Sequence, residues 1–92
     1  MKYNWSDEKN QILKEQRHIS FEDILEAIRN DGLIGIEPHY NKEIYGHQSV
    51  MFVNIRGYVY LIPFVYDREK EEAFLKTIIP SRKHTKRLKE QL

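Results

Sequence analysis

The chain has 92 residues and a formal net charge of +1, with 40% hydrophobic and 32% charged residues. This length supports one hydrophobic core and one domain, residues 1–92, and the composition is that of a folded chain rather than a disordered one. The absence of cysteine excludes disulfides, thiolate metal sites and cysteine nucleophiles. No apolar run approaches the roughly 20 residues of a membrane-spanning helix, so we expect a cytoplasmic protein without a membrane partner.

The charge is unevenly distributed, although its sum is small. Between residues 82 and 90 the sequence places five basic residues and one acid, namely Arg82, Lys83, Lys86, Arg87, Lys89 and Glu90. A local basic patch of this kind can bind phosphate groups or an acidic partner. We therefore expect the functional surface to lie near the C-terminal end of the chain.

Two helices are predicted in the first third of the chain. The first is expected from Ser6, a residue suited to cap a helix, to about Arg17. The second begins at Ser20, which Asp23 follows at the spacing of a capping box, and its apolar residues recur at helical spacing. This helix ends before Gly32, which we expect to take the left-handed conformation that often follows a last turn.

Four strands are predicted next, separated by turn residues. They span residues 33–37, 48–55, 58–66 and 73–79, with an irregular loop over 39–46. Arg56-Gly57 predicts a tight hairpin between the second and third strands. Both faces of the third strand are apolar or aromatic, so we expect it to be central and covered on both sides. Pro63 in this strand lacks an N–H group, which predicts a bulge or an edge-facing position there.

The last predicted strand leads into a basic helix. Pro80 cannot continue a sheet ladder, and Ser81 is suited to cap the helix that follows. The order of elements predicts an α+β fold with two N-terminal helices, a four-stranded, mainly antiparallel sheet and a basic C-terminal helix.

Four stretches spread over nearly the whole chain form a recognisable set. They are Tyr3-Asn4-Trp5-Ser6, Arg17-His18 followed by Ser20-Phe21-Glu22-Asp23, Tyr45-Gly46, and Ile78-Ile79-Pro80-Ser81-Arg82-Lys83-His84-Thr85-Lys86-Arg87. This set resembles the BrnT toxin family of bacterial type II toxin–antitoxin pairs. Its most specific element is the basic Arg-Lys-x-Thr motif directly after an apolar strand, and the strand over 58–65 resembles a divergent branch of the family.

The resemblance implies a function, a fold and partners. It implies a metal-independent endoribonuclease without a cofactor, whose fold is distantly similar to RelE-like ribonucleases and whose substrate is RNA. It also implies neutralisation by a cognate antitoxin with a ribbon-helix-helix part, through which alone the toxin would reach operator DNA.

Cleavage of RNA without a metal needs a base for the 2′-OH, a cation for the phosphorane and an acid for the leaving 5′ oxygen. The candidates for this chemistry are His18, Arg56, Lys76, Arg82, Lys83 and His84. The favoured phosphate ligands are Arg82 and Lys83, because the first turn of a helix also directs backbone N–H groups outward. Lys86 and Arg87 extend this phosphate-binding surface, and the two histidines are the candidates for proton transfer.

These candidates also have plainer interpretations. A lone histidine on a small domain is usually a surface residue, which applies to His18 and His84. Arg82 and Lys83 could pair with acids on the helices, and Lys76 could lie at a sheet edge with its ammonium in water. His39 and His47 could share a metal in principle, but the sequence shows no nearby carboxylate pattern at ligand spacing.

The same pattern leaves a second function open. The protein could be a non-catalytic module of the same fold that binds an antitoxin-like protein or nucleic acid. Gln48-Ser49 favours this alternative, because the BrnT-like pattern commonly places an arginine there.

Overall fold

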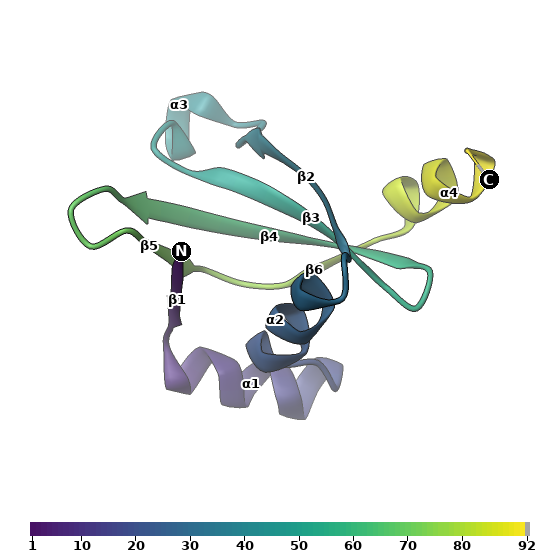
Figure 1. The fold of residues 1–92 in the computed structure, drawn as a ribbon, viewed down its shortest axis with the longest axis horizontal. Helices are drawn as coiled ribbons and strands as arrows, with labels where there is room; N and C mark the ends of the chain where they lie inside the picture. Colours follow the sequence, from purple (N-terminus) through teal and green to yellow (C-terminus); the bar gives the residue numbers. More distant parts are fainter. Residues whose placement is uncertain (92) are drawn as a thin grey trace.

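The computed structural model describes residues 1–91, which form an α+β domain (Figure 1). Its elements are β1 (Lys2–Trp5), α1 (Asp7–Arg17), α2 (Phe21–Arg29), β2 (Leu33–Pro38), α3 (Lys42–Tyr45), β3 (Ser49–Ile55), β4 (Tyr58–Asp67), β5 (Glu72–Leu75), β6 (Ile79–Ser81) and α4 (Arg82–Glu90). Within this described part, no helix is both long and apolar enough to span a membrane.

The strands form one six-stranded mixed sheet in the order β1-β5-β4-β3-β2, with β6 also paired to β4. The β1–β5 pair is parallel, and the other pairs are antiparallel. The four-stranded, mainly antiparallel sheet predicted from the sequence is therefore wrong. The prediction missed β1 because its alternation, with Tyr3 and Trp5 turned toward the core, covers only four residues directly before a helix cap.

The predicted last strand over 73–79 is also wrong, because it is two strands with a break between them. β5 ends at Leu75 and β6 begins at Ile79, and the two pair with successive parts of β4. β6 continues through Pro80, which pairs with Tyr60, so the expectation that Pro80 ends the ladder is wrong. Opposite the break, the Pro63 carbonyl accepts a hydrogen bond of 2.8 Å from the Lys76 N–H. In a β-strand, the N–H and C=O groups of one residue point toward the same neighbouring strand. The N–H group that Pro63 lacks would therefore point toward the gap between β5 and β6, where strand pairing is interrupted.

The three predicted helix starts are confirmed. Ser6 and Ser81 each accept a hydrogen bond from the third backbone N–H that follows, and Ser20 forms the full capping box with Asp23. The prediction did not include α3, a single turn capped by Asn41 inside the expected loop. One turn has too few residues to show helical periodicity.

Two turns show how backbone conformation depends on the surroundings. Arg56 and Gly57 both have positive φ, 53° and 88°, which confirms the predicted hairpin. The prediction for Gly32 is wrong, because Asp31 takes the left-handed conformation with φ 62°. A Cβ atom on Gly32 would lie 2.6 Å from the Ala27 carbonyl oxygen, so glycine is needed there for close packing.

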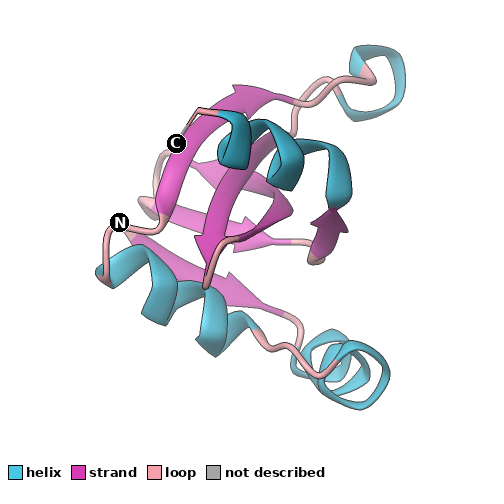
Figure 2. Cartoon of the chain, turned by 90° about the vertical axis from the view of Figure 1, so that its right-hand side faces the viewer, coloured by secondary structure: helices cyan, strands magenta, loops and turns pink. Residues whose placement is uncertain are grey.

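The sheet lies between α1 and α2 on one side and α4 on the other, as Figure 2 shows. The core lies between the sheet and the first two helices, and consists of Leu13, Ile19, Phe21, Ile24, Met51, Val53, Ile62, Phe64, Ala73, Leu75 and Ile78. On the opposite face of β4, Val59 is buried near α4. β4 is therefore the central strand that was predicted, but α4 covers only part of its second face, on which Leu61 is half-buried.

Candidate functional site: a groove between α4 and the sheet edge

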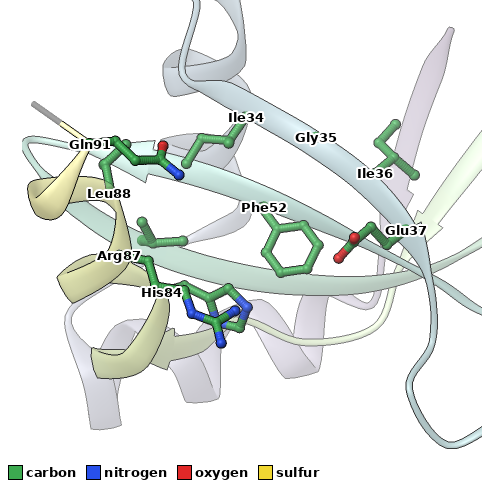
Figure 3. Close-up of a pocket in the computed structure, with 10 residues that line it drawn as sticks. Ile34, Gly35, Ile36, Glu37, Phe52, His84, Arg87, Leu88 and Gln91 are labelled. Carbon is green, nitrogen blue, oxygen red and sulfur yellow. The ribbon is translucent and has the colours of Figure 1, made fainter.

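A groove of about 470 Å³ lies between helix α4 and the edge strand β2 (Figure 3). It is lined by Ile34, Gly35, Ile36, Glu37, Phe52, Val59, His84, Arg87, Leu88 and Gln91. Phe52 and Val59 alternate along their strands with Met51 and Ile62, which face the core. The α4 groove therefore opens on the sheet face opposite α1 and α2.

The hydroxyl of Thr85 holds α4 against β4. Thr85 is 5% exposed, and its Oγ1 atom accepts a hydrogen bond of 2.8 Å from the Val59 N–H. The same hydroxyl donates a hydrogen bond of 2.7 Å to the Ser81 carbonyl. This anchoring turns one face of α4 toward the groove, where residues recur at helical spacing as His84, Arg87, Leu88 and Gln91.

His84 is positioned by its own helix cap. Its Nδ1 atom lies 2.7 Å from the Ser81 hydroxyl, which also accepts the His84 backbone N–H at 3.2 Å. The imidazole ring lies 5.0 Å from the Phe52 ring, centroid to centroid. The contact with Ser81 engages Nδ1, so Nε2 is the ring nitrogen available to a ligand in the groove.

The cations of α4 are exposed and lie along one helix. Among residues 1–91, the ion pair within 4.0 Å joins Lys14 to Glu22, so no described carboxylate lies within that distance of an α4 cation. The predicted phosphate ligands Arg82 and Lys83 are both exposed in the first turn. They do not line the groove, whereas Arg87, one turn further along, does so beside His84 (Figure 3).

Two of the predicted catalytic residues lie in a different cleft. His18, at the end of α1, and Arg56, in the β3–β4 turn, line a cleft of about 1040 Å³ on the side of α1 and α2. The same cleft is lined by the acids Asp23, Glu26 and Asp31. Three carboxylates beside one guanidinium disfavour a phosphate group, so this cleft is the poorer candidate for a phosphate site.

Lys76 lies apart from both sites. Its ammonium is 5.1 Å from the centroid of the Phe74 ring, and Phe74 pairs with Val65 on β4. Val59, which faces α4, is six residues from Val65, or about 20 Å along an extended strand. The structure thus brings His84 together with Arg87, but it places His18, Arg56 and Lys76 elsewhere.

The sequence prediction did not include two groove residues, Phe52 and Glu37. The alternation of β3 places Phe52 on the face opposite Met51, which is a local signal. Glu37 faces the same groove only because of the β2–β3 register, which pairs Glu37 with Val50 and Gly35 with Phe52. That register includes an irregularity between Leu33 and Gly35, so alternation alone could not have assigned it.

His39, considered above as a metal ligand, has protein partners instead. It is 6% exposed, its ring lies against Tyr40 and Tyr45, and its Nδ1 atom accepts the Asn41 N–H at 3.1 Å. In the described part of the chain, no group of three or more His, Asp or Glu side chains is placed to hold a metal ion.

The chain matches no family model, and no significant match was found among curated proteins or solved structures.

The arrangement in the α4 groove is a guanidinium and an imidazole on one side of an aromatic ring, with a carboxylate on the other (Figure 3). A guanidinium can hold a phosphate, and an imidazole can exchange a proton near neutral pH.

Proposed function

We propose that the protein is a toxin of the BrnT type, a metal-independent endoribonuclease that binds RNA along α4 and cleaves it at the groove. The observation that carries this proposal is that Arg87 and His84 line one groove beside a row of exposed cations. Phosphate contacts from such a row position a nucleic-acid strand without reading its sequence.

The reaction uses the groups that face the groove. The 2′-oxygen of the substrate attacks the phosphorus while the imidazole of His84 takes the proton from the 2′-OH. Arg87 donates hydrogen bonds to the phosphorane oxygens, where negative charge accumulates. The P–O5′ bond breaks, the 5′ oxygen takes a proton from water at the open side of the groove, and a 2′,3′-cyclic phosphate remains on the other product.

The proposed partner is a cognate antitoxin of the ribbon-helix-helix type. An acidic segment of such a protein would pair with Lys83 and Lys86 and exclude RNA from α4. Operator DNA would then be reached only through the DNA-binding part of the antitoxin.

The test is cleavage of a labelled single-stranded RNA by the purified protein in the presence of EDTA. We expect His84→Ala and Arg87→Ala to lower the cleavage rate by at least about a hundredfold, as is typical for loss of a proton-transfer or charge-stabilising group. Arg29→Ala is the matched control, because Arg29 is an exposed arginine in the last turn of α2. Cleavage that depends on His18 and Arg56 instead would place the active site in the acidic cleft.

One observation favours the alternative of a non-catalytic RNA- or antitoxin-binding module. The histidines predicted for proton transfer, His18 and His84, line different cavities, so the α4 groove holds one imidazole. A binding module would hold RNA with an affinity that falls steeply as salt rises, and would leave the RNA intact. Binding of a protein partner without any binding of RNA would exclude the RNA-binding form of this alternative.

A further inference from the structure

The floor of the α4 groove contains the aromatic ring of Phe52, and the residue opposite it on the neighbouring strand does not cover this ring. Phe52 on β3 pairs with Gly35 on β2, so the position opposite the ring has no side chain. A Cβ atom added to Gly35 would meet no atom within 4 Å. Phe52 is itself only partly buried. The space beside its ring is therefore open to a ligand.

Polar groups flank this ring on opposite sides. The His84 ring lies 5.0 Å away, and Arg87 lies on the same side. On the other side, the Glu37 carboxylate points toward Phe52, as Figure 3 shows. Glu37 pairs with Val50, two residues along β3 from Phe52, so the register also places both side chains on one face. A flat ligand on the ring would thus meet cationic and imidazole groups at one end and a carboxylate at the other.

We propose that the groove is a nucleobase subsite selective for guanine in single-stranded RNA, an inference that rests on the proposed RNA-binding function. The base would stack on Phe52 in the space beside Gly35, as bases stack on aromatic side chains in single-strand binding proteins. The phosphate of the same nucleotide would face Arg87 and the cations of α4.

Guanine is the base that the Glu37 carboxylate favours. An ionised carboxylate only accepts hydrogen bonds, and it does so through two adjacent oxygens. Guanine offers two neighbouring donors, N1–H and the N2 amino group, on its Watson–Crick edge. Adenine and cytosine each place an acceptor nitrogen beside their amino group there, and uracil places carbonyl oxygens on both sides of its one donor. Both arrangements bring an acceptor against the carboxylate.

The test compares two short RNAs, an oligoadenylate and the same strand with one central guanosine, by fluorescence anisotropy at fixed salt. Both strands carry 2′-O-methyl groups, which remove the 2′-OH that cleavage requires. We expect the guanosine strand to bind about tenfold more tightly, in line with one bidentate contact to a base. Glu37→Gln should abolish this preference. Its affinity for the oligoadenylate should stay equal or rise, because one negative charge near the phosphates is removed.

A second variant tests the stacking space separately from the stability of the fold. Gly35→Val adds a side chain where the added Cβ meets no atom, and valine is favoured in strands. We expect its urea midpoint to be equal to or above that of the wild type, while both RNAs bind about tenfold more weakly.

The outcomes separate this inference from the proposed function. Equal binding of the two RNAs by the wild type, or unchanged binding by Gly35→Val, would overturn the guanine subsite while RNA binding stands. A guanine preference without any cleavage would support the subsite and exclude the endoribonuclease. No RNA binding at all would overturn both.

Discussion

The two faces of strand β4 both carry apolar side chains, but their surroundings differ. On the face toward α1 and α2, Ile62 is fully buried, as are its neighbours Met51 and Phe21. On the face toward α4, Val59 is buried while Leu61 and Phe52 are only partly so. The first face completes a core, and the second leaves an open groove with an apolar floor.

The charges on the two sides also differ. The cleft on the α1 and α2 side is lined by Asp23, Glu26 and Asp31, whereas the side of α4 carries Arg82, Lys83, Lys86 and Arg87. A phosphate chain would be repelled by the first surface and attracted by the second, although the net charge is only +1. The sum of charges therefore predicts less about binding than their separation across the sheet.

The largest difference in stability should come from replacing one phenylalanine on each side of the sheet with alanine. Phe21→Ala removes a 0% exposed side chain and should cost about 3–5 kcal/mol of unfolding free energy. Phe52→Ala, on a partly exposed ring, should cost about 1–2 kcal/mol and weaken RNA binding. Urea denaturation of the two variants measures the difference. Equal destabilisation would mean that both faces are core.

The next effect concerns the contact between α1 and α2. Asn10 is 5% exposed, donates a hydrogen bond of 2.7 Å to Glu22 and accepts the Phe21 N–H at 2.8 Å. Asn10→Ala leaves that buried N–H without its partner, so we expect a loss of about 2–3 kcal/mol in urea denaturation. Gln11→Ala, at an exposed position of the same helix, is the control and should cost under about 0.5 kcal/mol.

A smaller effect is expected on the α4 side. Thr85→Val keeps the shape of the side chain but removes the acceptor for the Val59 N–H, and should cost about 1–2 kcal/mol. Hydrogen exchange at the Val59 amide should accelerate, and Thr85→Ser should restore its protection because the hydroxyl returns. Unchanged protection in Thr85→Val would show that this hydroxyl does not hold α4 in place.

The smallest effect is a pH dependence that belongs to the α1–α2 side. The hydrogen bond from the Asn10 amide, followed by one from the backbone of Glu22 itself, lowers the pKa of the Glu22 carboxyl below its ordinary value of 4.5. A carboxyl whose pKa is lowered in the folded state stabilises the protein at pH values above its ordinary pKa. This contribution is lost as the pH falls through the folded-state pKa.

Glu22→Gln removes this titration. Its urea midpoint should therefore fall less than that of the wild type between about pH 6 and about pH 3. Both proteins lose the contributions of their other carboxyls over the same range, so the difference between them isolates Glu22. Identical slopes for the two proteins would contradict the assignment.

Local features of the fold could be predicted because each depends on a few consecutive residues. The caps at Ser6, Ser20 and Ser81 and the Arg56-Gly57 hairpin follow from side-chain and backbone preferences within one turn. The basic character of α4 is equally local, since its cations are adjacent in the chain. The sequence by itself thus determined where the helices begin, where the main hairpin turns and which helix is basic.

The tertiary structure decided which of these features meet. The β2–β3 register places Gly35 opposite Phe52 and Glu37 beside it, and the break opposite Pro63 divides one expected strand into two. His18 and His84 line different cavities, which lie on opposite sides of β4. These relations depend on pairing between segments distant in sequence, and a shift of one residue in a strand would exchange its faces. That is why composition and spacing predicted a basic helix but not the groove beside it.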